Sequence, residues 1–458
     1  MYNINFKQPL HVHFIGIGGI SMSGLAEILL KENFTISGSD AKPSALTEHL
    51  AGLGATISYP QKATNITTDI DVVVYTAAIR EDNPELAEVK RRGLPMLTRA
   101  ELLGQLMHNY RNPIAVAGTH GKTTTTSMIS HVLLAGEKDP TISVGGILKA
   151  IGGNIRVGNS DVFLTEACEY TNSFLDFFPK ISVILNVEED HMDFFKDIDD
   201  IRASFHRFAA LLPEDGVLIL NQNIEKSEAI TDGLSCKIVT YSESQQADYS
   251  ASDITFDEFG SASFNLIKYG EYAGRISLSV AGIHNVSNAL SAIAVADVLD
   301  IPFDSIQKGL LSFTGTDRRF EYKGERNGFT IIDDYAHHPT EIKATLTSVQ
   351  NYPHREVWCV FQPHTYTRTK TFFYEFADAL SLADHVILAD IYAARETDTL
   401  GISSKALAEE LQKRGVDAYY LPSFEAIENF VLKKCIHGDV LITMGAGDVV
   451  NIGNSLLG

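Results

Sequence analysis

Residues 114–127 constrain the fold of this chain more than any other stretch, because their sequence, IAVAGTHGKTTTTS, joins an apolar run to a glycine turn. The run IAVA is small or β-branched, which is typical of a buried strand. Gly118 and Gly121 then allow a tight turn, and Lys122 opens a threonine-rich segment that we predict to be a helix. This combination indicates a phosphate site, since backbone N–H groups, a helix N-terminus and a lysine all attract anions.

The turn is close to a P-loop but departs from it at one position. A strict P-loop carries glycine five residues before Gly121, where this chain has Val116. Thr123 stands where a P-loop places the hydroxyl that binds Mg²⁺. A plain strand-to-helix turn is the alternative, but it leaves the lysine–threonine pair unexplained. We therefore predict a nucleoside-triphosphate site, most simply for ATP. Its residues are Gly118, Thr119, His120, Gly121, Lys122, Thr123 and Thr124.

Length and composition predict a multidomain protein of the cytoplasm. At 458 residues the chain is too long for one core, and roughly 150 residues per domain suggests three domains. No apolar run reaches the roughly 20 residues of a membrane span, and the N-terminus has no export signal. Four widely spaced cysteines indicate neither a zinc site nor a disulfide framework. The net charge of −21 argues against a nucleic-acid binder, since phosphate backbones require basic patches.

Strand-like and helix-like segments alternate along most of the chain, which predicts an α/β fold with largely parallel sheets. Only residues 242–280 indicate antiparallel strands. The expected domains are residues 1–110, 111–316 and 317–458. The expected strands include His11–Ile15, Thr35–Gly38, Asp71–Tyr75, Val162–Glu166, Ile181–Leu185, Val217–Asn221, Phe329–Asp334 and Val440–Met444. The expected helices include Ser21–Asn33, Leu46–Gly54, Asn285–Val298 and one that begins at a capping box of Thr98 and Glu101.

A second glycine turn, GIGGISMSG at residues 16–24, follows the first expected strand and opens a helix. Glycines there permit a tight turn and a close approach of the backbone to a diphosphate. Asp40 lies where a Rossmann unit places its ribose-binding acid, although the third glycine is off that pattern. We predict a site for a nucleotide or a nucleotide-sugar diphosphate, with close packing as the alternative. Its residues are Gly16, Gly18, Gly19, Ser23 and Asp40.

Two acidic segments that follow apolar strands are candidate metal sites. Glu166, with Glu169 nearby, has the usual position of a Mg²⁺ ligand, although a solvated loop is the alternative. The stretch NVEEDHMD carries Asp190 and His191, which could hold a second divalent ion. Histidine is an uncommon partner for Mg²⁺, which prefers oxygen, so a surface loop stays an alternative there.

The remaining candidates are polar groups at strand ends, at helix starts and at a domain boundary. Asn285 and Asn288 could read the edge of adenine or could cap a helix. Arg318 and Arg319 suit phosphate or carboxylate, with a solvated charge cluster as the alternative. The stretch DDYAHHPTE, residues 333–341, is too polar to be idle at a sheet edge, although its last residues also resemble a helix start. In FQPHTYTRT, Arg368 could bind a carboxylate with two parallel hydrogen bonds.

The order of these motifs along residues 11–448 resembles that of the Mur ligases of peptidoglycan synthesis. The motifs are GIGGISMSG, GTHGKTTT, NVEEDHMD, HNVSNALSA, DRRFE, DDYAHHPTE and FQPHTYTRT. The resemblance implies a Rossmann-like domain for a UDP-sugar, a central P-loop ATPase-like domain, and a C-terminal Rossmann-like domain with amino-acid and nucleotide contacts. Within the family, GIGGISMSG and DDYAHHPTE favour a member that uses ATP and Mg²⁺ to join L-alanine to UDP-N-acetylmuramate through an acyl phosphate.

The resemblance also implies a role for each matching residue. Lys122, His337 and Arg368 would be catalytic, with the last two facing the alanine and the reacting carboxylate. The implied metal ligands are Thr123 and Glu166 for one ion and His191 for a second. The implied nucleotide contacts outside the glycine turn are Asn285, Asn288, Arg318, Asp334 and Tyr335. The implied partners are small-molecule substrates, with no nucleic acid and no membrane insertion, and we expect a monomer or homodimer.

Three departures from the family pattern and three rival functions stay open. Thr365 stands where relatives often have arginine, and Cys168 interrupts a stretch usually read EADES. The segment ASFHRFA offers no lysine for the carbamylation found in siblings, so we do not predict that modification. The nearest rival is a murein-peptide recycling ligase on the same sugar nucleotide. The first glycine turn with Asp40 also suggests a nicotinamide-dependent oxidoreductase, and a non-catalytic nucleotide-gated module is a third alternative.

Overall fold

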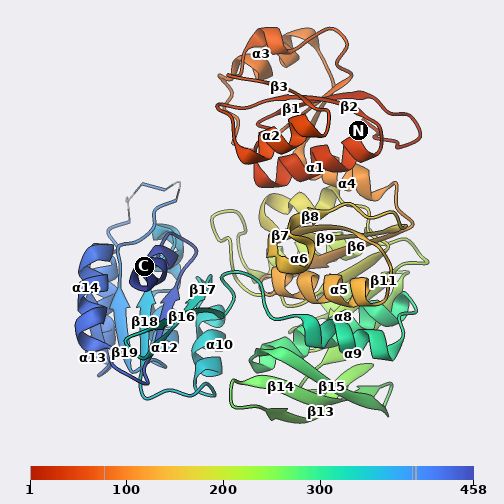
Figure 1. The fold of residues 1–458 in the computed structure, drawn as a ribbon. Helices are drawn as coiled ribbons and strands as arrows, with labels where there is room; N and C mark the ends of the chain where they lie inside the picture. Colours follow the sequence, from red (N-terminus) through yellow and green to blue (C-terminus); the bar gives the residue numbers. More distant parts are fainter. Residues whose placement is uncertain (1, 77, 395, 398–399) are drawn as a thin grey trace. The chain divides into compact units, whose positions relative to one another are not determined.

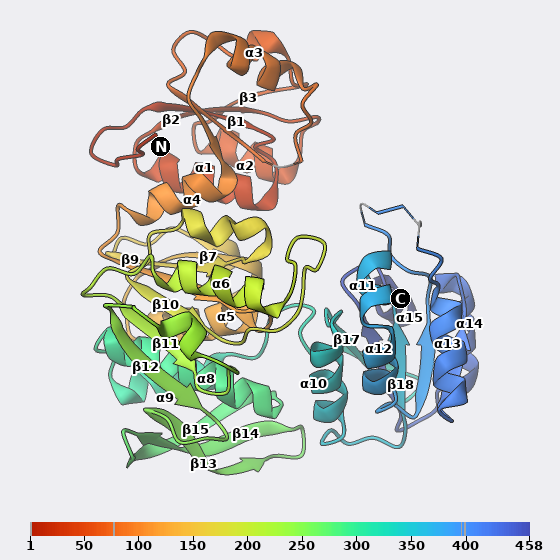
Figure 2. The same cartoon turned by 180° about the vertical axis from the view of Figure 1, so that it is seen from behind.

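The computed structural model describes residues 2–76, 78–394, 396–397 and 400–458, and the chain divides into two compact units (Figures 1 and 2). Unit 1 consists of Met1–Glu188, Ile198–Thr240 and Ser291–Ile306. Unit 2 consists of Glu189–Asp197, Tyr241–Leu290 and Gln307–Gly458. The strands form three sheets, so the predicted α/β alternation is confirmed. No helix in the described ranges is both long and apolar enough to cross a membrane.

The first sheet is fully parallel, with the strand order β3-β2-β1-β4-β5. Its strands are β1 (His11–Ile15), β2 (Thr35–Ser39), β3 (Thr56–Ser58), β4 (Val72–Tyr75) and β5 (Met96–Thr98). Its helices are α1 (Ile20–Lys31), α2 (Ala45–Gly52), α3 (Pro84–Arg92) and α4 (Arg99–Met107). The order reverses between β1 and β4, and ligands of doubly wound sheets bind outside the strand ends at such a switch point. Figure 1 shows α1 and α2 on one face and α3 on the other.

The second sheet has ten strands in the order β15-β14-β13-β12-β11-β10-β6-β9-β7-β8. Its parallel centre, β11-β10-β6-β9, carries the P-loop-like turn after β6. Its strands are β6 (Asn112–Ala117), β7 (Thr141–Leu148), β8 (Gly153–Arg156), β9 (Val162–Ala167), β10 (Ile181–Ile184), β11 (Val217–Asn221), β12 (Lys237–Ser242), β13 (Tyr249–Phe256), β14 (Ser261–Lys268) and β15 (Glu271–Ala281). The antiparallel strands expected within 242–280 are confirmed as β13, β14 and β15.

Five α-helices and two short 3₁₀ helices lie between or after these strands, and a third 3₁₀ helix belongs to the first sheet. The α-helices are α5 (Lys122–Ala135), α6 (Ile198–Ala209), α7 (Glu228–Thr231), α8 (Ile283–Val298) and α9 (Phe303–Ser312). The 3₁₀ helices are η2 (Lys149–Ile151) and η3 (Tyr170–Asp176) here, and η1 (Ala63–Asn65) after β3 of the first sheet. Helix α5 begins at Lys122, as the threonine-rich segment predicted.

The third sheet, in unit 2, has the order β16-β17-β21-β18-β19-β20. Its strands are β16 (Glu321–Arg326), β17 (Phe329–Asp334), β18 (Val357–Phe361), β19 (His385–Leu388), β20 (Asp417–Tyr420) and β21 (Val440–Met444). Its helices are α10 (Pro339–Val349), α11 (Tyr366–Thr371), α12 (Phe373–Leu380), α13 (Ser404–Lys413), α14 (Phe424–Lys434) and α15 (Val450–Leu457). The expected strands of this domain began with Phe329–Asp334, but the antiparallel strand β16 precedes it. That strand, EYKGER, lies at a sheet edge and has no apolar run for sequence reasoning to find.

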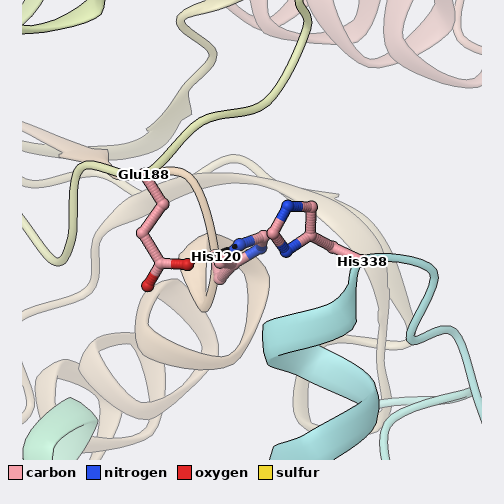
Figure 3. A group of neighbouring side chains, drawn as sticks. All are labelled: His120, Glu188 and His338. Atoms are coloured by element: carbon pink, nitrogen blue, oxygen red, sulfur yellow. Dashed lines mark ion pairs between the residues drawn. The ribbon is translucent and has the colours of Figure 1, made fainter. Parts of the chain in front are cut away.

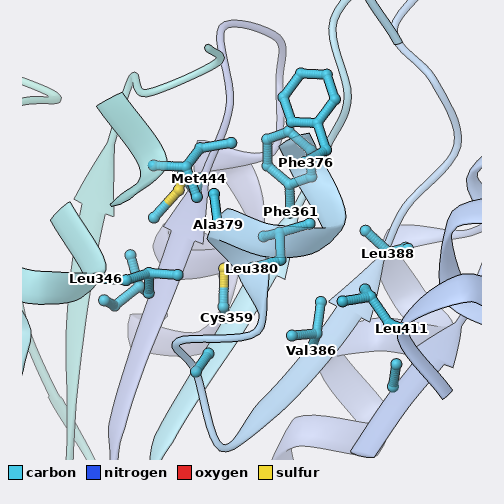
Figure 4. Close-up of a cluster of buried hydrophobic side chains, with 14 of the residues drawn as sticks. Leu346, Cys359, Phe361, Phe376, Ala379, Leu380, Val386, Leu388, Leu411 and Met444 are labelled. Atoms are coloured by element: carbon cyan, nitrogen blue, oxygen red, sulfur yellow. The ribbon is translucent and has the colours of Figure 1, made fainter. Parts of the chain in front are cut away.

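Apolar side chains cover both faces of this third sheet. On one face, buried residues of α10, α12 and α13 pack on the strands. Figure 4 shows part of this cluster, in which Leu346 and Phe376 come from helices and Cys359 and Phe361 from β18. On the other face, α14 and α15 contribute a second buried cluster that includes Ile427. Because both faces are buried, polar side chains that follow these strands gather at the sheet edges.

Candidate active site

The central glycine turn requires glycine at both of its ends. Gly118 has φ 147° and Gly121 has φ 82°, a region of backbone conformation that favours glycine. A Cβ at Gly118 would also lie 2.9 Å from the Cβ of Leu185. Gly121 is the N-cap of α5, and no side chain caps this helix among the described residues. The turn therefore presents the unsatisfied N–H groups of α5 that attract an anion.

The segment after β10 holds this turn in place. The Asn186 side chain accepts a hydrogen bond from His120 N (2.7 Å) and donates one to His120 O (3.1 Å). The Thr119 hydroxyl accepts a hydrogen bond from Glu188 N (3.0 Å). His120 Nε2 lies 3.6 Å from the Glu188 carboxylate, and Figure 3 shows both side chains. Sequence reasoning interpreted this segment only as a metal-binding or surface loop, and it missed the role of Asn186.

The Lys122 ammonium is hydrogen-bonded to carbonyl groups of the turn and to a nearby carboxylate. Its Nζ donates to Gly118 O (2.5 Å), to Thr119 O (3.1 Å) and to the Glu169 carboxylate (2.9 Å). Burial disfavours the charged lysine, but the nearby Glu169 carboxylate more than offsets it, so the pKa of Lys122 is raised. The lysine is therefore a full positive charge, and its partner in this structure is the Glu169 carboxylate.

The structure brings two predicted metal ligands together beside the turn. The Thr123 hydroxyl donates to Glu166 Oε2 at 3.1 Å, and Gly145 N donates to Glu166 Oε1 at 2.6 Å. A carboxylate and a hydroxyl at the start of a helix are the oxygen donors that Mg²⁺ prefers, so these residues fit a magnesium ion. Thr124 lies in the same first turn of α5 and is half-buried.

A cavity of about 550 Å³ lies at the switch point of the first sheet. The residues around it come from the turn after β1, the segments after β2, β3 and β4, and the start of α4. They are Gly16, Gly18, Gly19, Ile20, Ser21, Met22, Asp40, Ala41, Gln61, Thr76, Ala78, Ile79 and Arg99. Four of the five residues predicted for the diphosphate site are among them. Ser23 is not, since it is buried in α1 and its hydroxyl donates to Ile20 O.

Close packing explains some of the glycines in this turn. Gly18 N donates to Asp40 Oδ2 at 2.8 Å, and a Cβ at Gly18 would lie 2.8 Å from that oxygen. A Cβ at Gly24 would lie 2.0 Å from Ile155 Cγ1, so α1 packs on β8 through this glycine. Gly24 therefore serves packing, and Gly18 orients the Asp40 carboxylate at the wall of the cavity, while the diphosphate site stays a prediction.

In unit 2, Arg368 pairs with an acidic residue of the NVEEDHMD stretch. Its Nη2 donates to Asp190 Oδ1 at 2.7 Å, and its Nη1 lies 3.2 Å from His364 Nδ1. Burial opposes the charged carboxylate, but the Arg368 guanidinium holds the pKa of Asp190 well below its usual range. His191 donates its backbone N–H to Asp190, so this predicted metal ligand lies in unit 2, whereas Thr123 and Glu166 lie in unit 1.

His337 is a buried neutral imidazole. Burial lowers its pKa to about 4, and its Nδ1 lies 3.0 Å from Tyr335 O and 3.3 Å from Glu341 Oε2. Because both of those oxygens are acceptors, Nδ1 carries the ring proton and Nε2 is left as a proton acceptor. A neutral acceptor of this kind can accept a hydrogen bond from an amine near neutral pH.

The predicted nucleotide contacts of unit 2 have internal roles in this conformation. Arg318 donates to Asp333 (3.0 Å), Gly447 O and Gly445 O, and it lies 4.8 Å from the centre of the Tyr335 ring. Asp334 accepts from Ala336 N and Phe320 N, and burial raises its pKa to about 6. Both side chains fasten the loops beside the third sheet. These contacts leave the implied contacts with ATP a prediction.

Asn285 and Asn288 are buried and bonded to each other. Asn288 Nδ2 donates to Asn285 Oδ1 at 3.1 Å, and Asn285 Nδ2 donates to Ala281 O. Helix α8 begins at Ile283, two residues before the predicted start. Neither asparagine is therefore the N-cap, which removes capping as the explanation for them.

Comparison with known proteins covers the whole chain. Three family models match: Mur ligase family, catalytic domain (residues 11–111), Mur ligase middle domain (116–296) and Mur ligase, glutamate ligase domain (318–447). The UDP-N-acetylmuramate–L-alanine ligase of Lachnospira eligens is 60% identical over 458 residues, 100% of both chains. That of Agathobacter rectalis is 60% identical over 457 residues, again 100% of both chains.

A solved structure extends the likeness to the fold. The crystal structure of UDP-N-acetylmuramate-alanine ligase from Thermotoga maritima has a TM-score of 0.79, with 28% identity and 98% of each chain covered. Together with the family models, this match confirms the predicted three-domain α/β fold. The domain boundaries near residues 110 and 316 stay predictions.

Proposed function

The chain belongs to the Mur ligase family, and we propose that it joins L-alanine to UDP-N-acetylmuramate using ATP. The products are UDP-N-acetylmuramoyl-L-alanine, ADP and phosphate, so the protein is an amide-bond-forming ligase of peptidoglycan synthesis. The observation that carries the proposal is the 60% identity, over the full length of both chains, to UDP-N-acetylmuramate–L-alanine ligases. ATP and a UDP-sugar are metabolites of the cytoplasm, which is where we place the reaction.

We assign the triphosphate of ATP to the central glycine turn. The lactyl carboxylate of the sugar attacks the γ-phosphorus, ADP leaves, and an acyl phosphate forms. Two anions repel each other along this path, so positive charge at the γ-phosphate lowers the barrier. The ammonium of Lys122 and the uncapped N-terminus of α5 supply it, and both belong to one turn that Asn186 holds in place.

Thr123 and Glu166 would hold a magnesium ion at this turn, because their oxygens are adjacent and of the kind that the ion prefers. When bound, the ion would neutralise phosphate charge as the carboxylate approaches. His191 is our candidate ligand for a second ion. Its neighbour Asp190 has carboxylate oxygens, so the two residues offer a nitrogen ligand and an oxygen ligand for a metal ion.

The amine half of the reaction is assigned to side chains of unit 2. The amine of alanine must lose a proton before it attacks the acyl phosphate and expels phosphate. His337 is our candidate for orienting the neutral amine by a hydrogen bond, since its Nε2 is an acceptor on an imidazole that burial keeps neutral. Arg368 is our candidate for binding a substrate carboxylate, and it would exchange its bond to Asp190 for that contact.

Phosphate release, measured with ATP, Mg²⁺ and UDP-N-acetylmuramate across a panel of amines, tests the proposal. The panel contains L-alanine, glycine, L-serine, D-glutamate and the recycling tripeptide. We expect release that requires both the sugar nucleotide and L-alanine. Release with the tripeptide but not with L-alanine would instead assign the chain to the recycling ligases. Folded protein without any sugar-dependent release would contradict the ligase function.

A further inference from the structure

A row of polar side chains runs across the first sheet, from an exposed carboxylate to a buried one. His11 and His13 lie on β1, and Ser37 lies opposite His13 on β2. His11 Nδ1 lies 2.9 Å from Asp69 Oδ2, and His11 Nε2 lies 2.8 Å from Ser37 Oγ. His13 Nδ1 lies 2.9 Å from the same hydroxyl, and His13 Nε2 faces Glu85 Oε2 at 3.7 Å. Asp69 is exposed, whereas His13 and Glu85 are buried.

The buried end of this row needs a proton and a positive charge. Burial opposes the charged form of Glu85, but the adjacent His13 ring and hydrogen bonds from Ser39 and Asn65 more than offset it, so the pKa of Glu85 is lowered. No lysine or arginine of the described ranges pairs with this carboxylate, and a buried charge is costly without a counter-charge. His13 Nε2 is buried and has no hydrogen-bond partner among the described residues. A protonated His13 would supply both the missing donor and the counter-charge.

The number of available protons shows which state of the row is complete. The row contains four pairs of facing atoms: Asp69 with His11, His11 with Ser37, Ser37 with His13, and His13 with Glu85. Each pair needs one proton between its two atoms. Two neutral imidazoles and one hydroxyl supply three protons, so one of the four pairs lacks its proton. One added proton fills all four pairs and gives the row a single positive charge between its two carboxylates.

We propose that His11, Ser37 and His13 form a proton relay that carries one exchangeable proton between the exposed Asp69 and the buried Glu85. In the neutral row, His13 carries its proton on Nε2, toward Glu85, which leaves His11 Nδ1 as the acceptor at the exposed end. A proton from solvent binds there. His11 Nε2 then gives its proton to the Ser37 oxygen as the hydroxyl gives its own to His13 Nδ1, so the positive charge moves from His11 to His13.

The relay ends at the residue that holds the first glycine turn. Ser39 Oγ donates to Glu85 Oε2, and Ser39 O accepts from Gly16 N (2.9 Å) and Ile17 N (3.0 Å). When the charge is on His13, the Glu85 carboxylate has a counter-charge and stays bonded beside the end of β2. When the row loses its proton as pH rises, that counter-charge is lost and the support of the turn weakens. The relay is therefore a pH-sensitive support of the turn.

One further titratable group meets the row among the described residues. The Asp71 carboxylate, in the loop before β4, accepts a hydrogen bond from His11 N at 2.8 Å. This contact is made to the backbone, so it leaves both nitrogens of the His11 ring to Asp69 and Ser37. The charged groups around the two rings are thus the carboxylates of Asp69, Asp71 and Glu85.

Histidine-selective ¹⁵N NMR of the full-length protein tests the relay, because the shift of each ring nitrogen reports its protonation. Spectra are recorded over the pH range in which the protein stays folded. We expect His11 and His13 to lose one proton along a single common curve, as coupled groups do. Ser37→Ala should separate the two curves, because it removes the hydroxyl that joins the rings. The control is His49, an exposed histidine of α2 beside Glu27, which should follow its own unchanged curve in both proteins.

Amide exchange tests the link to the turn. The exchange rates of Gly16 and Ile17 are divided by that of Val183, on β10 of the second sheet, which removes the common base catalysis. This ratio should rise about tenfold as the row loses its proton, as expected when a bond to a charged group is weakened. Ser39→Ala keeps the carbonyl but removes the hydroxyl, so it should abolish the pH effect on the ratio and leave the common histidine curve in place.

Three results would overturn the inference. A His13 Nε2 that carries no proton at any pH would exclude the relay, since the ring could not donate to Glu85. Independent curves for His11 and His13 in the wild type would also exclude it. A constant exchange ratio for Gly16 and Ile17 across a common histidine curve would overturn the link to the turn. The wild-type curves decide the matter even if Ser37→Ala does not fold.

Discussion

The two glycine turns of unit 1 share their backbone arrangement, but the cationic side chains beside them, Lys122 and Arg99, differ in their partners. Both turns join a parallel strand to a helix whose N-terminus no described side chain caps. At the central turn, Lys122 is already bonded to Glu169 and to two carbonyls of the turn. At the N-terminal turn, Arg99 forms no ion pair with the described residues and donates a hydrogen bond to the Ser21 hydroxyl. The cation of the central turn therefore already has an internal counter-ion, whereas the cation beside the N-terminal turn has only a neutral hydrogen-bond partner.

The largest effect that we predict is at Lys122. Lys122→Ala should lower phosphate release at least about 10³-fold, because the charge at the γ-phosphate is lost. Binding of UDP-N-acetylmuramate should stay within about twofold of wild type, since the two turns hold different ligands. Coupled phosphate release and calorimetry measure the two quantities. Near-normal turnover would remove the assignment of ATP to the central turn.

A smaller effect is expected when the internal anion of the central turn is removed. Glu169→Gln should destabilise the ligand-free protein by about 2–3 kcal/mol, because a buried ammonium loses its counter-charge. A non-hydrolysable ATP analogue with Mg²⁺ should recover much of that loss, which urea unfolding with and without the analogue would show. Asp215→Asn is the control: it breaks the exposed pair with Lys180 and should cost less than about 1 kcal/mol. Equal losses of unfolding free energy in the two variants would mean that Glu169 is not an important counter-ion of Lys122.

Substitution of Glu166 should change the Mg²⁺ dependence of the central turn but not that of the N-terminal turn. Glu166→Gln should raise the Mg²⁺ concentration needed for half-maximal phosphate release by about tenfold, since a charged oxygen ligand is replaced by a neutral one. Binding of UDP at the N-terminal turn should not change with Mg²⁺ in either protein. Titrations of Mg²⁺ in the phosphate assay and in UDP binding test both statements. An unchanged Mg²⁺ requirement would exclude Glu166 as a ligand.

The smallest effect concerns packing around the N-terminal turn. Gly24→Ala should destabilise the protein by about 1–2 kcal/mol, because its Cβ would lie 2.0 Å from Ile155 Cγ1. Gly52→Ala in α2 is the matched control, since a Cβ there would meet nothing within 4 Å and alanine favours a helix. Thermal unfolding of both variants measures the difference. A stable Gly24→Ala protein would mean that α1 is not held on β8 through this glycine.

Sequence reasoning found the parts of the site that lie next to each other along the chain. The strand, turn and helix around Gly121 could be predicted because local composition decides them, and the capping box at Thr98 is present as predicted. The pairing of Thr123 with Glu166 followed from the usual position of a metal ligand after a neighbouring strand.

What sequence reasoning missed depends on the order of strands in the sheets. Arg99 reaches Ser21, which follows the first glycine turn, because α4 starts directly after the edge strand β5, more than seventy residues later in the chain. Asn186 reaches the central turn because β10 lies beside β6. Asn186 begins the NVEEDHMD stretch and Arg99 lies within the capping box, but neither pattern indicates which turn the side chain reaches, since asparagine after a strand and arginine at a helix start are both common. A sequence signal exists only for Arg99, as a cation at an unfavourable helix position.

The internal bonds of Lys122 also affect how tightly an anion can bind at the central turn. An incoming anion gains only the difference between its own contacts and those with Glu169, Gly118 O and Thr119 O that it replaces. A single phosphate ion offers few contacts beyond that exchange, whereas a triphosphate adds contacts along the whole turn and through its nucleoside. We therefore expect the unliganded enzyme to bind inorganic phosphate weakly and ATP tightly, because only a multivalent ligand offers enough contacts to replace Glu169.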